Sequence, residues 1–202
     1  MKRIFDIIVA SIALVLVLPF LVVAALAVRL TSKGPAFFAH KRCGYRKVPF
    51  RCIKLRTMVP DAQDWLEQDS DLKAKYRENG FKLRSKEDPR VTNLGRFLRR
   101  SHLDELPQLI NVIRGEMSLV GPRPIIDEEL EWYGEDQDEL LSIRPGIFGP
   151  WTVLGRKRPE YPARASIELG YIRRTSRAKD LGLLWGHIPV LLMGQSEEVD
   201  HD

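Results

Sequence analysis

The chain has 202 residues, of which 44% are hydrophobic and 29% charged, and its formal net charge is +5. This length and composition suit one compact domain with its own core, and they exclude disordered, collagen-like and coiled-coil proteins. Two cysteines, Cys43 and Cys52, are too few for a disulfide framework and fit no zinc pattern, which favours a reducing compartment.

The first predicted element is an apolar segment, residues 7–28, in which Ser11 is the single polar side chain. A helix of about 20 such residues is long enough to cross the hydrocarbon core of a bilayer. Lys2 and Arg3 precede the segment, and residues 29–60, here called the basic collar, contain nine Lys and Arg but no Asp or Glu. The remaining body sums to −5. Positive charge beside a membrane segment favours anionic lipid head groups as a partner over nucleic acid.

Three interpretations of the apolar segment stay open. A secretory signal would explain the small residues Ala25-Leu26-Ala27, although its apolar core is usually about 7–15 residues long. A spanning helix has the required length. Basic residues at both ends keep both ends in the cytoplasm, and Pro19 predicts a kink or break near the middle. We therefore favour a re-entrant, proline-kinked membrane helix over residues 1–31, followed by a cytoplasmic domain over residues 32–202.

The rest of the chain predicts a single membrane-associated domain of the α/β class that is mostly helical. The predicted elements, in chain order, are short strands or irregular structure over 37–58, a polar helix over 61–78, broadly helical structure over 96–114, a Gly/Pro turn over 118–124, an acidic helix over 128–142, a loop at 144–146 and an apolar helix over 181–193. The last of these is a core helix or an interfacial one.

Residues 88–124 contain the most informative pattern of the chain. Pro107 is tolerated only near the start of a helix, so it places Asp104 and Glu105 in or beside a first turn. Unpaired backbone N–H groups gather there, and such a site favours carboxylates and phosphates. Helical spacing predicts an apolar face of Leu103, Leu106, Ile110 and Ile113 and a polar face of Asp104, Gln108 and Asn111.

The acidic pair has two interpretations. In the first interpretation, Ser101, Asp104 and Glu105 simply cap a helix. In the second interpretation, the pair belongs to a functional site. The arginines near it favour this interpretation, namely Arg96, Arg99, Arg100 and Arg123. One guanidinium group can bind two phosphate oxygens at once, through two parallel hydrogen bonds. Paired carboxylates can hold Mg²⁺ against a pyrophosphate, and one of them can act as a nucleophile.

Nine motifs extend the pattern along the chain. They are KRIFD (2–6), SKGP (32–35), KLRTM (54–58), DPRVT (88–92), LDELPQL (103–109), MSLVGPRP (117–124), RPGI (144–147), GR (155–156) and DL (180–181). On these motifs the chain resembles the bacterial sugar transferase family, the small monotopic phosphoglycosyl transferases or polyprenyl-phosphate glycosyl-1-phosphate transferases, over nearly its whole length.

The resemblance implies a reaction. A sugar-1-phosphate would pass from a UDP-sugar to polyprenol (undecaprenyl) phosphate with release of UMP, as the first step of a bacterial polysaccharide or glycoprotein glycan. Asp104 would be the nucleophile of a ping-pong mechanism through a covalent aspartyl phosphosugar. Glu105 would help to hold Mg²⁺ and act as general base. The enzyme would lie in the bacterial inner membrane with its catalytic domain on the cytoplasmic face.

The same resemblance implies further site residues. The phosphate-binding candidates are Arg99, Arg123, Lys54, Arg56 and Arg156, and the metal ligands are Asp104, Glu105 and Asp180. Lys54 and Arg56 have an alternative interpretation as lipid-facing charges of the basic collar.

Some positions depart from the family pattern. Phe148, Pro150 and Thr152 replace common residues, residues 157–164 differ, and Glu168 stands where an Asp is usual. The identity of the sugar therefore stays open, with a lean towards an N-acetylated amino sugar, and the oligomeric state is not predicted. Two rival functions are a non-catalytic membrane-surface adaptor that binds lipid and phosphate, and a phosphatase that passes an aspartyl phosphate to water.

Overall fold

The computed structural model describes residues 1–81, 83–154 and 159–192. Its helices are α1 (Lys2–Thr31), α2 (Ala62–Gln68), α3 (Ser70–Glu78), α4 (Asn93–Arg100), α5 (Gln108–Arg114), α6 (Gln137–Leu140), α7 (Ala163–Arg173) and α8 (Arg177–Leu192). Its 3₁₀ segments are η1 (Tyr45–Lys47), η2 (Leu103–Glu105), η3 (Asp127–Asp136) and η4 (Thr152–Leu154). The strands β1 (Phe37–Arg42) and β2 (Phe50–Leu55) form one sheet, and β3 (Ser118–Val120) and β4 (Gly146–Phe148) form another. The predicted mostly helical α/β class is confirmed.

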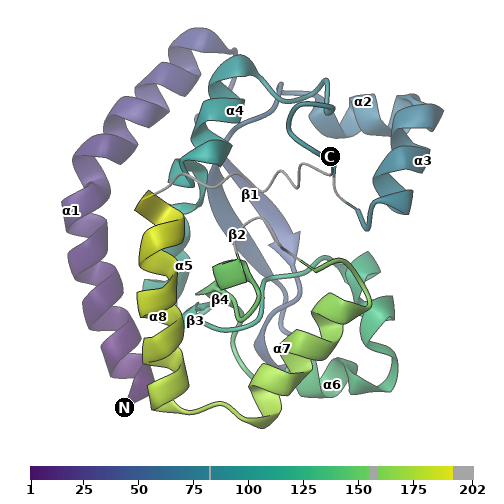
Figure 1. Ribbon diagram of the computed structural model, residues 1–202. Helices are drawn as coiled ribbons and strands as arrows, with labels where there is room; N and C mark the ends of the chain where they lie inside the picture. The colour runs from purple at the N-terminus through teal and green to yellow at the C-terminus, as the bar shows by residue number, and fades with distance from the viewer. Residues whose placement is uncertain (82, 155–158, 193–202) are drawn as a thin grey trace.

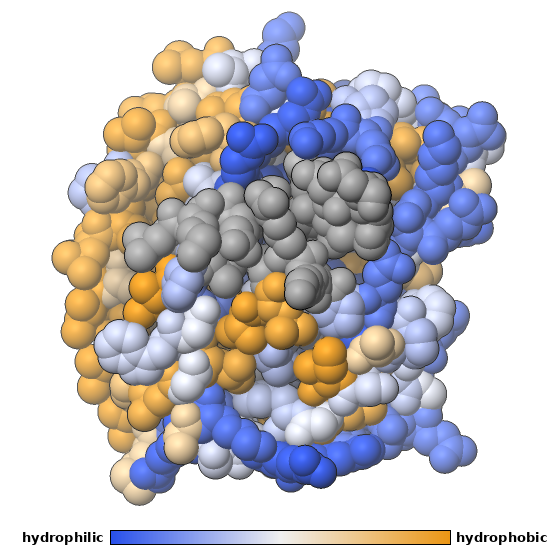
Figure 2. Space-filling view, in the orientation of Figure 1, coloured by the Kyte–Doolittle hydropathy of each residue, from blue (hydrophilic) through white to orange (hydrophobic). Residues whose placement is uncertain are grey.

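Helix α1 is one 30-residue helix that continues through Pro19. Figure 1 shows it bowed along one side of the molecule, so the proline bends the helix without ending it. It is long and apolar enough to cross a membrane, and 17% of its most apolar window is buried. Figure 2 shows the outer side of α1 as a continuous apolar surface. The predicted membrane-associated helix is therefore present.

Polar contacts fix both ends of α1 to the same body. Arg3 donates to two carbonyl oxygens near the end of α5, at 2.5 and 2.9 Å, and Asp6 accepts from the Ser118 hydroxyl at 2.7 Å. At the other end, Arg56 donates to two carbonyl oxygens of the turn after α1, at 2.6 and 2.9 Å. Between these ends, small and aliphatic residues of α1 pack on the core.

Strands β1 and β2 form an antiparallel hairpin in the centre of the molecule (Figure 1), so residues 37–58 contain strands, one of the two structures predicted for them. Helix α5 packs on β2 through Asn111, which is 0% exposed. The Asn111 side chain accepts from the Ile53 N–H at 3.0 Å and donates to the Arg51 carbonyl at 2.8 Å. The polar face predicted for this helix therefore lies against the hairpin.

The second sheet joins two segments that were predicted as a turn and a loop. β3 and β4 are parallel, with Ser118 opposite Gly146. The backbones approach so closely that a Cβ at Gly146 would lie 2.1 Å from the Gly121 nitrogen. Only glycine fits such an approach. The turn prediction is thus wrong for residues 118–120, and the loop prediction is wrong at Gly146, because pairing between the two segments makes both of them strands.

Three predicted helices differ in their details. The helix predicted over 61–78 is two helices, because the Asp69 side chain accepts from the Leu72 N–H at 2.9 Å and starts α3 anew. The stretch 96–114 is interrupted at His102, which is left-handed with φ 56°. The acidic stretch 128–142 is largely 3₁₀ and turns at Gly134.

The apolar C-terminal helix begins earlier than predicted. α8 starts at Arg177, four residues before the predicted start, and its predicted end at Met193 lies outside the described residues. Buried His187 and partly buried Leu183 and Leu184 face the core, whereas Trp185 is 71% exposed. The helix therefore has both a core face and an outward apolar face.

Candidate active site

Asp104 and Glu105 lie in the short turn η2, between α4 and α5. The left-handed His102 turns the chain after α4, and Pro107 precedes the first residue of α5, as its position in the sequence predicted. Asp104 is 7% exposed. A carboxylate that is this deeply buried next to a turn is well placed to react with a bound group rather than with bulk water.

The structure does not support the capping interpretation. Among the described residues, no side chain caps the start of α5. Ser101 instead ends α4, since its hydroxyl donates to the carbonyl oxygens of Phe97 and Leu98 at 3.0 and 3.1 Å. The acidic pair is therefore not part of a Ser-x-x-Asp/Glu cap.

Two predicted phosphate ligands meet Glu105. The Lys54 Nζ lies 2.6 Å from the Glu105 Oε1, and the Arg123 Nη1 lies 3.6 Å from the same oxygen. All three side chains are about one-fifth exposed. They line one small depression, together with Arg42 and Gln108. A part-buried carboxylate with two cations is an arrangement that can accept phosphate oxygens.

The turn that carries Arg123 is held from several sides. Pro122 and Pro124 have no N–H, so residues 121–124 contain just two backbone donors. The Gly121 N–H donates to the Phe148 carbonyl at 3.1 Å, and the Arg123 N–H donates to the Glu168 carboxylate at 3.2 Å. These contacts hold residues 121–124, the part of the predicted Gly/Pro turn that follows β3, in place.

Arg42 is a cation of this site that the sequence analysis missed. It lines the same depression, donates to the Pro124 carbonyl at 3.3 Å and pairs with Glu129 at 3.5 Å. Burial lowers the pKa of Arg42, which still leaves guanidinium charged at neutral pH. Alternation along the hairpin was the available signal, because Arg42 and Lys54 fall on the same face of the β1–β2 pair.

The other predicted phosphate ligands lie in different surroundings. Arg99, in the last turn of α4, donates to the Thr57 hydroxyl at 3.0 Å. The guanidinium of Arg56 is bound to the turn after α1, so its contacts are structural. Arg156 lies outside the described residues.

Asp180 is not brought to the acidic pair. Its carboxylate binds Lys2, at the start of α1, and accepts from the Tyr171 hydroxyl at 2.6 Å. Burial, together with this hydrogen bond, raises the pKa of Tyr171. The described part of the chain has no group of three or more His, Cys, Asp or Glu placed to hold a metal. The three-carboxylate set predicted from the resemblance is therefore not assembled.

The remaining pair still suits Mg²⁺. This ion is usually bound by one or two carboxylates plus substrate phosphates and water, rather than by a cage of protein ligands. Glu105 supplies one carboxylate beside cations that can bind phosphate oxygens, and Asp104 is its neighbour in the chain.

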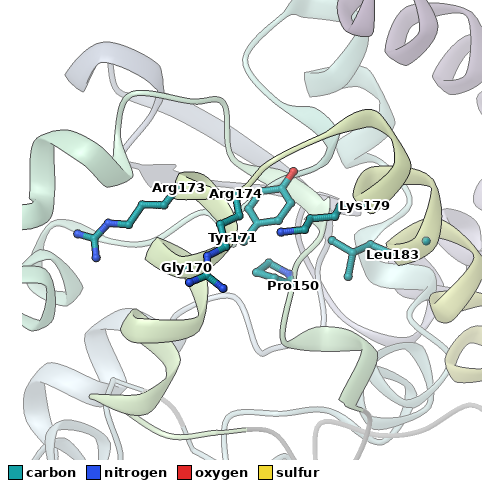
Figure 3. Close-up of a pocket in the computed structure, with 8 residues that line it drawn as sticks. Pro150, Gly170, Tyr171, Arg173, Arg174, Lys179 and Leu183 are labelled. Carbon is teal, nitrogen blue, oxygen red and sulfur yellow. The ribbon is translucent and has the colours of Figure 1, made fainter.

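A second depression lies between α7 and α8, away from these residues (Figure 3). Tyr171, Arg174 and Lys179 line it, and none of the predicted site residues does so. Arg173 also lines the depression, and its guanidinium pairs with Glu139 at 2.7 Å.

A carboxylate among clustered cations and a membrane-length helix are features of a class, the membrane-associated proteins that bind phosphorylated groups. Residues 1–194 match the family model described as bacterial sugar transferase, and the chain belongs to that family. The family and the prediction of a sugar transferase are thereby confirmed.

Several relatives are similar over almost the whole chain. The exopolysaccharide production protein ExoY of Rhizobium meliloti is 37% identical over 195 residues, which cover 96% of this chain and 86% of ExoY. The undecaprenyl-phosphate galactose phosphotransferase of Salmonella typhimurium is 39% identical over 196 residues, 95% of this chain but 40% of that protein. The UDP-glucose:undecaprenyl-phosphate glucose-1-phosphate transferase of Caulobacter vibrioides is 36% identical over 201 residues, 95% of this chain and 69% of that protein. The chain thus spans most of ExoY and less than half of the Salmonella protein.

Proposed function

We propose that this chain transfers a sugar-1-phosphate from a UDP-sugar to polyprenol phosphate and releases UMP. The observation that supports it best is the cluster of Glu105, Lys54 and Arg123 next to buried Asp104. The names of the Salmonella and Caulobacter relatives include undecaprenyl phosphate as the sugar acceptor, and the Caulobacter name includes UDP-glucose as donor. Each substrate of this reaction carries the phosphate groups that such a cluster binds.

In the first half-reaction, a carboxylate oxygen of Asp104 attacks the β-phosphorus of the UDP-sugar. The bond from this phosphorus to the bridging oxygen breaks, UMP leaves with that oxygen, and the sugar phosphate stays on Asp104 as an acyl phosphate. Lys54 and Arg123 neutralise the charge that develops on the phosphate oxygens. Asp104 and Glu105 would hold Mg²⁺, which supplies further positive charge against the pyrophosphate.

In the second half-reaction, an oxygen of the polyprenol phosphate attacks the same phosphorus and displaces Asp104. Any proton on the attacking phosphate passes to Glu105, which acts as general base. The products are polyprenyl-diphosphate sugar and the free carboxylate of Asp104. Only one site is needed for both halves, because UMP departs before the lipid phosphate reacts.

The proposed location is the cytoplasmic face of the bacterial inner membrane. The apolar side of α1 would lie in the lipid, and Arg29 and Lys33, the exposed charges of the basic collar at the end of α1, would face anionic head groups. Because both ends of α1 are fixed to the body, the acidic pair would stay close to the membrane surface. A soluble sugar nucleotide and a lipid-bound phosphate can both reach such a place.

A donor screen tests this proposal. The chain is incubated with undecaprenyl phosphate, Mg²⁺ and single UDP-sugars, including UDP-galactose, UDP-glucose and N-acetylated amino sugar donors, and UMP is measured. We expect one donor to give continuous UMP release that requires the lipid phosphate. Lipid binding without UMP would favour the adaptor, and inorganic phosphate released from simple monoesters would favour the phosphatase.

A further inference from the structure

Two buried glutamates lie directly behind the cations of the candidate site. We propose that Glu168 is a positioning residue that holds the Arg123 turn in place for phosphate binding, and that Glu129, joined to Glu168 through Arg164, holds Arg42 in the same way. This inference rests on the proposed function for the identity of the bound phosphate. It assigns a role to a position that differs from the usual family residue.

Glu168 is a fully buried carboxylate, with 0% of its surface exposed. Its Oε1 accepts from the Arg123 N–H at 3.2 Å and from the Trp151 Nε1–H at 2.6 Å. Its Oε2 accepts from the hydroxyl of Tyr133. Burial and the neighbouring Glu168 raise the pKa of Tyr133, which keeps the phenol protonated as a donor.

Arg164 joins Glu168 to the second glutamate. Its Nε lies 3.6 Å from the Glu168 Oε1, and its Nη1 lies 3.2 Å from the Glu129 Oε1. The guanidinium also lies over the rings of Trp151 and Tyr161, 4.7 Å from each centroid. A buried carboxylate is costly unless it is paired and hydrogen-bonded, and this arrangement meets both conditions for Glu168.

Glu129 holds the other cation of the site. It pairs with Arg42 at 3.5 Å and accepts from the Ile126 N–H at 3.0 Å. Glu129 and Glu168 therefore each contact one cation-bearing segment, and Arg164 connects them. Arg42 and Arg123 line the same depression on the far side of this network.

The turn of Arg123 explains why positioning matters here. Arg123 lies between two prolines, which have no N–H. Its own N–H donates a hydrogen bond to the Glu168 carboxylate. Loss of that acceptor leaves a part-buried N–H unsatisfied, so the turn relaxes and the Arg123 guanidinium shifts. Shifts of about 1 Å at residues that position a substrate can cost about 100-fold in rate.

Glu168→Met and Glu168→Gln form the main test. Methionine matches the length of glutamate but has no acceptor, whereas glutamine keeps one carbonyl oxygen for the Arg123 N–H. We expect Glu168→Met to lower kcat/KM for the UDP-sugar by about 10- to 100-fold, the usual effect of losing an outer-shell partner, and Glu168→Gln to recover most of it. Trp151→Phe is the control, because it removes a different donor to the same oxygen. It should lower Tm and leave kcat/KM nearly unchanged.

A double-mutant cycle with Arg123→Ala separates positioning from general stability. If Glu168 acts through Arg123, Glu168→Met costs little further activity in the Arg123→Ala background, so the two effects are not additive. Additive losses would overturn the inference. So would an equal loss of kcat/KM in Trp151→Phe.

Two measurements keep the inference separate from the proposed function. Hydrogen exchange of the Arg123 amide in the unmodified chain needs neither turnover nor a variant, and we expect strong protection. Rapid exchange would overturn the inference even if Glu168→Met fails to fold. The double-mutant cycle is also measured as pyrophosphate affinity, which needs no turnover. If the chain makes no UMP from any UDP-sugar, the proposed function is contradicted, but the binding data still test whether Glu168 is coupled to Arg123.

Discussion

Asp104 is the residue on which the proposed chemistry depends most. Asp104→Asn keeps the size of this buried side chain but removes the anionic oxygen that would attack phosphorus. We expect UMP release to fall by on the order of 10⁴-fold or more, as after loss of other nucleophiles. The circular dichroism spectrum and Tm should stay close to those of the unmodified chain. Asp127→Asn is the control, since Asp127 is exposed and pairs with Lys41. Robust turnover by Asp104→Asn would refute the nucleophile assignment.

Lys54 offers a matched comparison on one hairpin. Lys54 contacts Glu105 at 2.6 Å, while Lys41 pairs with exposed Asp127 at 3.1 Å. A hydrogen bond to a charged group is worth about 1.5–3 kcal/mol, so Lys54→Met should weaken pyrophosphate binding by roughly 10- to 100-fold. Lys41→Met should change it little, because exposed ion pairs contribute about 0–1 kcal/mol. Titration calorimetry with pyrophosphate measures both. Equal effects of the two variants would mean that the basic collar acts only through its total charge.

The two thiols should resist alkylation in the folded protein. Burial, with a hydrogen bond to Asp127, raises the pKa of Cys43 to about 12, and burial also raises the pKa of Cys52. The thiolate is the reactive form, so little is present at pH 8. We expect iodoacetamide to label neither cysteine at pH 8 until urea unfolds the chain, as followed by mass spectrometry. Fast labelling of Cys52, which lines the candidate site, would show that the site opens.

The sequence predicted the positions of residues that are fixed by their neighbours in the chain. It missed contacts between residues that are far apart in the chain. The acidic pair and Arg123 stand beside prolines that restrict the chain, and they lie where those restrictions indicate. Asp180 binds Lys2, which is 178 positions away, and no local pattern could reveal that contact. The contacts of Arg56 could not be predicted either, because its partners are backbone carbonyl oxygens and every residue has one.

Among the elements, α4 depends on a glycine for its position. A Cβ at Gly95 would lie 1.9 Å from the Thr57 carbonyl oxygen, so the helix packs backbone against backbone. Gly95→Ala must push α4 away and loosen the bond between Arg99 and the Thr57 hydroxyl. Overpacking of this kind costs about 1–3 kcal/mol, which we expect to see as a lower free energy of unfolding in urea. Gly182→Ala is the control, because nothing lies within 4 Å of its added Cβ. An unchanged unfolding free energy in Gly95→Ala would contradict this close packing.

The motif DPRVT is an example of an element whose meaning appears only in the fold. Arg90 donates twice to the Asp88 carboxylate, at 2.8 Å each, and both are buried. Thr92 then caps α4 by accepting from the Gly95 N–H at 2.9 Å. Helical segments were predictable from periodicity, but their ends were not, because side chains such as Asp69 and Thr92 decide them one contact at a time. Their type was not predictable either, since the acidic stretch is largely 3₁₀.

On the scale of the whole molecule, α1 and the body form one unit. The bowed helix lies along the side of the molecule in Figure 1, next to α8, and its outer side is apolar in Figure 2. A helix of 30 residues is about 45 Å long, more than the roughly 30 Å of a hydrocarbon core. Length and composition therefore indicated a membrane segment. They left its course open, because the course depends on where the two ends are bound.

These attachments predict the topology of α1. Arg3 and Arg56 bind opposite ends of the helix to one body, so a straight span would require the body to lie on both sides of the membrane. We expect both ends on the same side, with α1 held in one leaflet. In membrane vesicles, a protease-sensitive tag before Met1 and a labelled Lys33→Cys should both be reached from the cytoplasmic face and not from the opposite face. Accessibility from opposite faces would establish a spanning helix, and loss of the tag on maturation would establish a cleaved signal. Because buried Cys43 and Cys52 should stay unlabelled, the chain without Lys33→Cys supplies the background of the same experiment.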